Sequence, residues 1–383
     1  MPAPLEEGET RSPGHHIELV DDNPSPKHEG ETSPGLRNSK GWDGKLRVPP
    51  KNAVLANPEA LSDPEYSDDE HIVPGEEVAA DEDLLDGEPL DTDEIMCTHS
   101  RIQSINALQL KRFTKVARIC LRQNLIQDIE GLSGVAATLE DLDLYDNLIS
   151  HISRAGLADL TGLTCLDLSF NKIKHIKHIN HLQNLKDVFF VSNKISKIEG
   201  LEGLTKLRNL ELGSNRIREL ENLSSLTELE ELWVAKNKIT ELHGLGGLAN
   251  LRLLSIQSNR IRDLSPLRDV PQLEELYISH NALESLTGLE QNTKLRVLDV
   301  SNNKVASLAG LGPLADLEEL WASYNLVSDM ADVERELADK KKLTTVYFEG
   351  NPLQLRSPAL YRNKVRLTLP QVHQIDATFV KTS

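Results

Sequence analysis

A nine-residue pattern, LxxLxLxxN, recurs eleven times between Val116 and Asn351. The copies begin with VARICLRQN, LEDLDLYDN and LTCLDLSFN, and they end with LEELWASYN and LTTVYFEGN. From Asn171 to Asn325 the closing asparagine returns every 22 residues without a break. A unit this short cannot bury its apolar positions alone, so each copy must stack against its neighbours. The repeat therefore predicts an elongated stack of similar turns.

The pattern is typical of leucine-rich repeats, and it predicts an α/β leucine-rich-repeat solenoid with a parallel, concave sheet. Positions 1, 4 and 6 of each copy are apolar and share a buried side. Positions 3, 5 and 7 face the other way on a short strand, because side chains alternate along a strand. The asparagine is expected to hydrogen-bond the backbone of adjacent turns. About ten residues remain for each return, which favours 3₁₀ turns or short helices on the convex side.

The first part of the chain differs in composition from the repeats. Residues 1–97 hold 25 Asp/Glu, 7 Lys/Arg and 12 of the 18 prolines, whereas residues 98–383 hold 35 acidic and 35 basic residues. Few apolar side chains are available to offset the entropy of ordering such a segment. We therefore expect residues 1–97 to be a disordered, acidic, proline-rich tail.

Two interpretations of this tail stay open. It could be a solubilising extension, or it could be a regulatory arm that is phosphorylated. Ser12, Ser25 and Ser33 each precede a proline, and Ser67 is followed by three acidic residues. Phosphorylation at these sites would deepen a charge that is already negative.

Both ends of the repeat array need caps, because a terminal repeat has a neighbour on one side only. Residues 98–115 are predicted to form an N-terminal capping half-repeat, residues 116–351 the eleven repeats, and residues 352–383 a C-terminal cap. For the second cap we expect a short helix and an extended end that bury five apolar residues: Leu360, Val365, Leu367, Leu369 and Ile375.

Several classes of protein are not indicated. No apolar stretch approaches the roughly 20 residues needed to span a membrane, and the acidic N-terminus argues against a signal peptide. Three cysteines without metal-ligand spacing suit a reduced, intracellular protein. No glycine-rich phosphate loop or nucleophile motif occurs. His175, His178 and His181 straddle an apolar pattern, which favours a solvated turn over a metal site. We expect no catalysis, cofactor or metal.

The concave strand positions carry an unusual set of side chains. Position 5 holds four carboxylates, five aromatic rings and no basic residue, and position 3 holds five carboxylates and one arginine. Polar residues alone would suit an exposed strand, but exposed aromatics flanked by charge are typical of a protein interface. We expect this face to bind a basic protein partner and to repel nucleic acid. The position-5 aromatics are Phe189, Trp233, Tyr277, Trp321 and Tyr347.

Longer phrases add a resemblance. NKISKIEGL, LELGSNRIREL, KNKIT, QSNR, VYFEGNPLQ and LPQVHQIDATFV occur in this order. With its 22-residue repeat, residues 98–383 resemble the leucine-rich-repeat regulatory subunits of protein phosphatase-1, with a fungal member favoured. The resemblance implies a non-catalytic protein of nucleus and cytoplasm, which grips the phosphatase catalytic subunit with its concave face. It also implies a small disordered inhibitor as a third component, and roles in phosphatase maturation and mitosis.

The resemblance further implies which residues touch the phosphatase. Trp233 departs from the pattern, because animal members are expected to have phenylalanine there, and the last repeat is stretched to 26 residues around Ala338–Lys342. Lys186–Phe190 matches a basic–Val–x–Phe docking peptide, but Val188 and Phe190 fall on core positions, so the peptide should not detach. The implied contacts are Asp167, Phe189, Glu211, Trp233, Asp299, Glu319, Trp321 and Tyr347.

Two other functions fit the sequence less well. A structural adaptor of a ribonucleoprotein would have few repeats and an apolar groove, which fits eleven copies and nine inner carboxylates poorly. A GTPase-activating solenoid would need a catalytic arginine or asparagine on an exposed edge, and no such constellation is evident.

Overall fold

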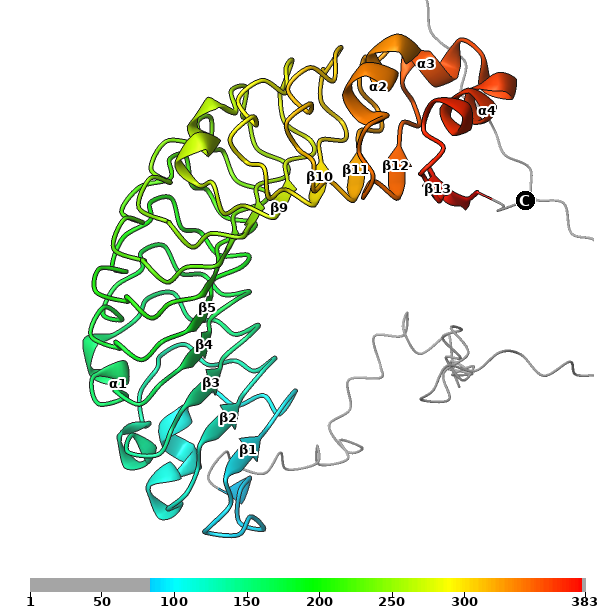
Figure 1. The fold of residues 1–383 in the computed structure, drawn as a ribbon. Coiled ribbons are helices and arrows are strands. Elements are labelled where there is room, and N and C mark those ends of the chain that lie inside the picture. The colour runs from blue at the N-terminus through cyan, green and yellow to red at the C-terminus, as the bar shows by residue number, and fades with distance from the viewer. Residues whose placement is uncertain (1–82, 381–383) are drawn as a thin grey trace, which may run out of the picture. The chain divides into compact units, whose positions relative to one another are not determined.

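The computed structural model describes residues 83–380, which lie within a compact unit spanning 76–383. These residues form a curved solenoid whose strands line its inner edge (Figure 1). In the described part of the chain the sheet has 14 strands in sequential order, and every neighbouring pair is parallel except β13 and β14. The strands are β1 (Glu94–Met96), β2 (Arg118–Cys120), β3 (Asp141–Asp143), β4 (Cys165–Asp167), β5 (Asp187–Phe189), β6 (Asn209–Glu211), β7 (Glu231–Trp233), β8 (Leu253–Ser255), β9 (Glu275–Tyr277), β10 (Val297–Asp299), β11 (Glu319–Trp321), β12 (Thr345–Tyr347), β13 (Gln374–Ile375) and β14 (Thr378–Phe379).

The strand register is the one that the repeat predicts. Each strand from β2 to β12 consists of positions 3, 4 and 5 of its copy, and equivalent positions pair across the sheet, as Glu211 does with Trp233. The middle residue is fully buried, as Leu210 and Leu232 illustrate. Because side chains alternate, positions 3 and 5 all emerge on the concave face. The predicted parallel, concave sheet is therefore confirmed.

The predicted asparagine ladder is also present. Asn215 Oδ1 accepts a hydrogen bond from the Ile195 amide at 3.0 Å, while its Nδ2 donates to the carbonyls of Phe190 and Leu212 at 2.8 and 3.0 Å. One side chain thus satisfies backbone groups of two successive turns. The residue before the asparagine adopts a left-handed conformation, as at Ser214 with φ 56°. This kink leads the chain off the strand and points the asparagine inward.

The convex side contains short helices in only some repeats. The 3₁₀ helices are η5 (Ile105–Leu108), η6 (Leu110–Arg112), η7 (Ser133–Val135) and η8 (Ser265–Asp269), and the α-helices of the repeats are α1 (Arg154–Leu157) and α2 (Met330–Leu337). Most other returns are irregular turns. At Gly200 the backbones of successive returns pack closely, because this residue has φ +71° and a Cβ there would collide with the Ile176 carbonyl.

The N-terminal boundary of the solenoid was predicted wrongly. Strand β1 (Glu94–Met96) pairs in parallel with β2, and Leu85, Ile95 and Cys97 are buried. Residues 83–97 therefore belong to the solenoid, and residues 98–115 complete a divergent first repeat in which Ser100 replaces the asparagine. The Ser100 amide donates to Asn124 of the next turn at 3.0 Å. The predicted tail over residues 1–82 lies outside the described residues.

At the other end, a helical cap covers the last repeat (Figure 1). It consists of α3 (Pro352–Leu355), α4 (Pro358–Thr368) and the antiparallel pair β13 and β14. Val365, Leu369 and Ile375 are buried as expected, but Leu360 and Leu367 are 56% and 78% exposed, so this part of the prediction was wrong. The buried stripe of α4 follows Tyr361 and Val365, and neither leucine lies on that stripe of a helix with 3.6 residues per turn.

Polar contacts fasten this cap to the last repeat. Asp376 Oδ1 accepts hydrogen bonds from the amides of Phe348 and Glu349, and its Oδ2 accepts one from the Tyr361 hydroxyl at 2.9 Å. The extra residues of the stretched repeat form α2 and the turn after it, where the buried Lys340 donates to the Gly312 carbonyl at 2.9 Å. Tyr347 still pairs in register with Trp321.

Candidate functional site

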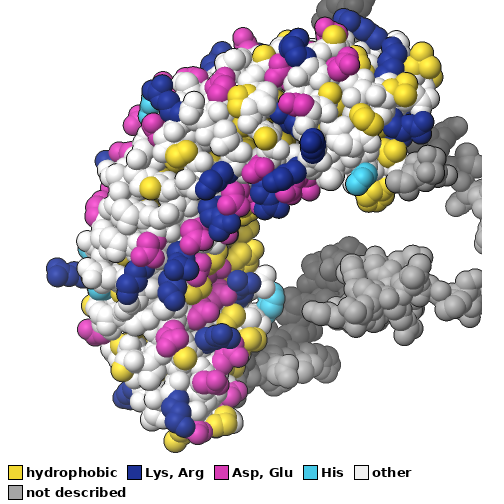
Figure 2. Space-filling model, in the orientation of Figure 1, with side chains coloured by type: hydrophobic (Ala, Val, Ile, Leu, Met, Phe, Trp, Pro, Cys, Tyr) yellow, Lys and Arg dark blue, Asp and Glu magenta, His cyan; other side chains and the backbone are white. Residues whose placement is uncertain are grey.

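The surface singled out by the sequence is the concave face, defined as the third and fifth positions of β2 to β12. Acidic, basic and hydrophobic side chains are interleaved along the inner edge of the arc (Figure 2). The nine predicted contact residues run from Asp167 on β4 to Tyr347 on β12, on one side of the sheet. Adjacent strands are about 4.8 Å apart, so these residues form a long surface and do not converge on one reaction centre.

Acidic and aromatic residues form pairs within single strands. A carboxylate at position 3 and a ring at position 5 lie on the same face, because they are two residues apart. The ring's polar atom donates to that carboxylate, which fixes the ring before any partner arrives and lowers the ordering cost of binding. The pairs are Trp233 Nε1 with Glu231 at 3.1 Å, Tyr277 Oη with Glu275 at 2.8 Å, and Trp321 Nε1 with Glu319 at 3.1 Å.

Three of the rings form a continuous aromatic run toward the C-terminal cap. The ring centroids of Tyr277 and Trp321 are 6.4 Å apart, and those of Trp321 and Tyr347 are 5.9 Å apart, both in edge-to-face geometry. The Tyr347 hydroxyl accepts a hydrogen bond from Gln374 Nε2 of the cap at 2.6 Å. All three rings are half-buried. The run therefore offers anchored rings with part of each surface free.

Asp299 differs from the exposed contact that the sequence predicted. It lies on β10, between the strands that carry Tyr277 and Trp321, and it is only 7% exposed. Its Oδ1 accepts a hydrogen bond from the Ser301 amide at 3.0 Å. In the unbound protein Asp299 is thus a buried acceptor. The edge-to-face contact of the two flanking rings explains its low exposure.

Burial affects the ionisation of several concave carboxyls. Burial raises the pKa of Glu211 above its ordinary range, and the nearby Asp167 adds to this effect. The pKa of Asp187 is raised by burial and then by Glu231. Burial likewise raises the pKa of Asp167, although hydrogen bonds from Ser169 oppose the shift. A cationic group placed over these carboxylates would relieve their unfavourable environment.

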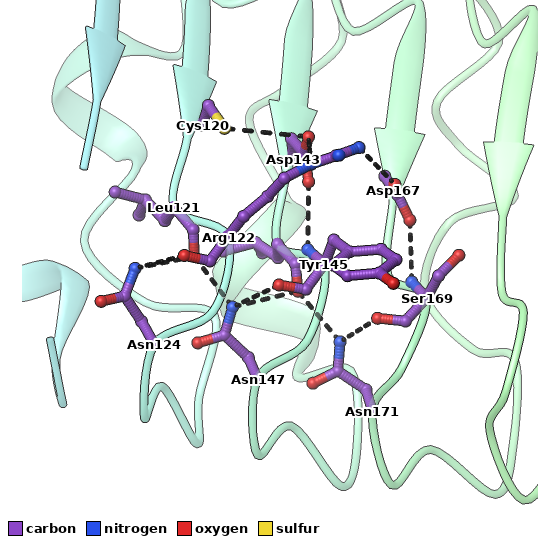
Figure 3. A network of polar contacts seen from close by, with 11 residues as sticks. Cys120, Leu121, Arg122, Asn124, Asp143, Tyr145, Asn147, Asp167, Ser169 and Asn171 are labelled. Atoms are coloured by element: carbon purple, nitrogen blue, oxygen red, sulfur yellow. Dashed lines mark hydrogen bonds and ion pairs between the residues drawn. The ribbon is translucent and has the colours of Figure 1, made fainter. Parts of the chain in front are cut away.

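Arg122 was not among the predicted site residues, but it lies at position 7 of its repeat and reaches onto the concave face (Figure 3). Its guanidinium forms ion pairs with Asp143 and with Asp167, the latter at 3.3 Å. It also lies 4.9 Å from the ring centroid of Tyr145, whose ring contacts that of Phe170 in a tilted geometry with the centroids 4.8 Å apart. The predicted site residues came from positions 3 and 5 of the repeats, and a basic residue at position 7 was the sequence feature that could have indicated Arg122. Asp167 is therefore already paired, and the N-terminal part of the face is partly neutralised.

Two other sequence motifs make contacts within the solenoid itself. Val188 and Phe190 of the Lys186–Phe190 peptide are fully buried, so the peptide is part of the core. His175 pairs with Glu199 at 2.9 Å, and His181 Nε2 lies 3.1 Å from the Leu157 carbonyl. Within residues 83–380, no group of three or more His, Cys, Asp or Glu side chains is arranged to hold a metal ion.

The cysteines and the helices add no further site. Cys97, Cys120 and Cys165 are free thiols, and burial raises the pKa of Cys165 to about 12, which keeps it protonated at neutral pH. Across residues 83–380 none of the helices combines the length and apolar character needed to cross a bilayer.

Comparison with known proteins identifies both the repeat and a set of relatives. A family profile described as leucine-rich repeats (2 copies) matches residues 183–225, 227–269 and 271–313. The protein phosphatase 1 regulatory subunit SDS22 of Schizosaccharomyces pombe is 68% identical over 53 residues, 14% of this chain and 16% of the relative. SDS22 of Saccharomyces cerevisiae is 42% identical over 75 residues, 19% of this chain and 22% of the relative.

This chain is similar to protein phosphatase 1 regulatory subunits. The resemblance inferred from the sequence phrases is thereby confirmed. Protein phosphatase 1 regulatory subunit 7 of Danio rerio is another such relative, 55% identical over 51 residues, 13% of this chain and 14% of the relative. The matched stretch spans about a sixth of the S. pombe relative's own length. These relatives are named as regulatory subunits and not as enzymes.

Solved structures support the fold. An internalin (InlF) from Listeria monocytogenes has a TM-score of 0.59 at 24% identity, covering 76% of this chain and 87% of that chain. The leucine-rich-repeat domain of APL1 has a TM-score of 0.58 at 22% identity, covering 70% and 71%. At these identities the similarity concerns the fold alone, and it confirms the leucine-rich-repeat solenoid.

Proposed function

We propose that this protein is a non-catalytic regulatory subunit that holds the catalytic subunit of protein phosphatase-1 on its concave face. The names of the relatives support a phosphatase-1 partner. The observation that carries the choice of surface is the set of strand-internal pairs in which a carboxylate fixes a half-buried ring, such as Glu319 with Trp321. Anchored aromatics beside charge are typical of interface hot spots.

In this proposal the two kinds of side chain have separate tasks. The rings of Trp233, Tyr277, Trp321 and Tyr347 supply contact area that loses water on binding. The carboxylates, among them Glu211, attract and orient a basic surface of the phosphatase. Asp299 would contribute only where the neighbouring rings move apart. Asp167 is paired with Arg122 within this protein, so it would contact the phosphatase only by exchanging Arg122 for a basic group of the partner.

The broader role of the protein is part of the same proposal. Holding the catalytic subunit would control its activity, its maturation or its location, in the nucleus and cytoplasm and during mitosis. A small disordered phosphatase inhibitor would join as the third component. The carboxylate-rich face would repel nucleic-acid phosphates, so no nucleic-acid partner is proposed.

Calorimetry with the full chain and purified phosphatase-1 catalytic subunit tests the proposal. Trp321→Ala removes an anchored ring and leaves Glu319 without its donor, so we expect a loss of at least ~2 kcal/mol of binding free energy. Glu319→Lys combined with Trp321→Ala should abolish measurable binding and its dependence on salt.

The matched control is Arg216→Ala with Arg218→Ala, two exposed residues after the ladder asparagine of β6's repeat. This control should bind as the wild type does. No binding by the wild type would overturn the phosphatase assignment. If the double variant bound with the affinity of the wild type, phosphatase-1 would remain the partner, but the concave face would not be its binding site.

A further inference from the structure

A second surface lies at the C-terminal cap, away from the concave face. We define the cap face as Leu360, Lys364, Arg366 and Leu367, four exposed residues of α4. Leu360 and Leu367 are seven residues apart, so they lie on one side of the helix, about 10 Å from each other along its axis. The opposite side of α4 buries Tyr361 and Val365 against the solenoid.

Large exposed hydrophobic side chains lie toward both ends of the described solenoid and not in its middle. From residue 171 to residue 323 no large hydrophobic side chain is exposed, although the concave face lies largely within that span. Residues 324–379 contain six large hydrophobic side chains that are more than half exposed: Tyr324, Leu326, Leu355, Leu360, Leu367 and Phe379. Leu360 and Leu367 share one side of a single helix, and neighbouring exposed apolar side chains can mark an interaction site.

The chain segment that contains these leucines carries only basic charge, while the acidic Glu334 and Glu336 lie on α2, which packs against α4. Residues 350–375 contain Arg356, Arg362, Lys364 and Arg366 but no Asp or Glu. Arg362 donates to the backbone carbonyls of Ile375, Thr378 and Phe379, which anchors the terminal hairpin. Within residues 83–380 the other three form no ion pair, whereas Arg252 and Arg296 on the solenoid pair with Glu274 and Glu318. Lys/Arg and hydrophobic side chains are prominent at this end of the arc (Figure 2).

We infer that the cap face docks an acidic, leucine-bearing segment of a second partner protein. Its apolar side chains would cover Leu360 and Leu367, and its carboxylates would pair with Lys364, Arg366 and Arg356. A lipid surface fits less well, because membrane-binding helices expose a wide apolar face, and α4 leaves only two leucines outside its packed side. The inference does not rest on phosphatase binding, since no concave residue takes part.

The test uses the full chain and a fluorescein-labelled peptide, EELAEEAEELAEEAE, whose two leucines are seven residues apart. Fluorescence anisotropy should show saturable binding that weakens as salt is raised. Leu360→Ser with Leu367→Ser should weaken binding at least ~10-fold through the lost apolar contact. Lys364→Glu with Arg366→Glu should weaken it at least ~10-fold by like-charge repulsion.

Two controls keep the result specific. Arg216→Glu with Arg218→Glu changes two exposed basic residues whose apolar neighbours, Ile217 and Leu220, are buried, and this variant should bind the peptide as the wild type does. A peptide with serine in place of both leucines should not bind. All substituted positions are exposed, so circular dichroism should show unchanged folding in every variant.

Several results would overturn the inference. The wild type could fail to bind the peptide, or both cap variants could bind it as well as the wild type does. Binding of the cap face to phosphatidylserine vesicles without peptide binding would assign the surface to lipid. Sedimentation showing a wild-type dimer that the cap variants dissociate would assign it to a second copy of this chain. Phosphatase binding by the cap variants is expected to stay unchanged in every case.

Discussion

At the scale of single residues, this solenoid uses polar side chains for two opposite purposes. Asn215 and its equivalents are buried, and every polar atom of the amide contacts the backbone of neighbouring turns. Glu319 and its equivalents are half-exposed and hold an aromatic ring on the surface. The first kind of contact stabilises the fold, while the second prepares an interface.

Asn215→Ala should lower the free energy of unfolding by roughly 1–3 kcal/mol for each buried backbone group left unpaired. The Ile195 amide would be left unpaired, whereas the Phe190 and Leu212 carbonyls would keep the hydrogen bonds that they accept from Asn193 and Asn237. Urea unfolding followed by circular dichroism measures the change. Asn363→Ala, an exposed change on α4, is the control and should have little effect. Equal stability of the two variants would mean that the ladder contributes nothing measurable.

At the scale of elements, parallel stacking places the side chains of each strand next to those of the strands beside it. Asp187 therefore lies between Cys165 and Asn209, and Glu211 lies between Phe189 and Trp233, so both carboxylates are half-buried among uncharged side chains. Burial raises the pKa values of both carboxyls, and the carboxylates of Glu231 and Asp167, each two strands away, add to the shifts of Asp187 and Glu211 respectively. Half-buried carboxylates without a cationic partner make the free protein less stable, and they strengthen the binding of a basic partner that supplies the missing positive charge.

Glu211→Gln should stabilise the free protein at neutral pH and weaken phosphatase binding. The raised pKa means that the folded state binds protons more tightly than the unfolded state. Stability is therefore lost as pH rises from the ordinary value, 4.5, through the folded pKa. Urea titrations at several pH values should show the gap between variant and wild type widening over this window. The control Glu284→Gln, at an exposed position on a return turn, should not differ from the wild type in this way. If the difference in unfolding free energy between Glu211→Gln and the wild type were constant with pH, ionisation of Glu211 would not be its cause.

At the scale of the whole molecule, a repeat array is stabilised mainly by contacts between neighbours, so its ends matter most. The cap after β12 and the divergent repeat before β2 each cover an edge strand that would otherwise expose unpaired backbone groups. The apolar residues after Asn351 predicted the C-terminal cap, whereas the N-terminal edge of the solenoid was predicted wrongly. The acidic composition averaged over residues 1–97 predicted a disordered tail, although Ile95 and Cys97 at its end are buried in the solenoid.

A chain of residues 98–383 should be less stable than one of residues 83–383. The shorter chain lacks β1 and exposes the edge of β2 and the apolar side of the first turn. We expect a lower melting temperature and a greater tendency to aggregate, measured by calorimetry and light scattering. Identical melting curves would show that the divergent first repeat adds no stability. A chain of residues 90–383, which keeps β1 but lacks Leu85, should fall between the two.

The sequence by itself determined the repeat, the strand register, the ladder and the face on which the predicted contacts lie, because the repeat assigns the apolar residues at positions 1, 4 and 6 of each copy to one core. It could not determine how side chains of different turns meet, since no local pattern records such contacts. Only the tertiary structure placed Arg122 on Asp167, buried Asp299 between two strands that carry rings, and turned Leu360 and Leu367 outward. The period specifies the direction in which each side chain leaves the backbone. Packing across turns decides which of those side chains remain available to a partner.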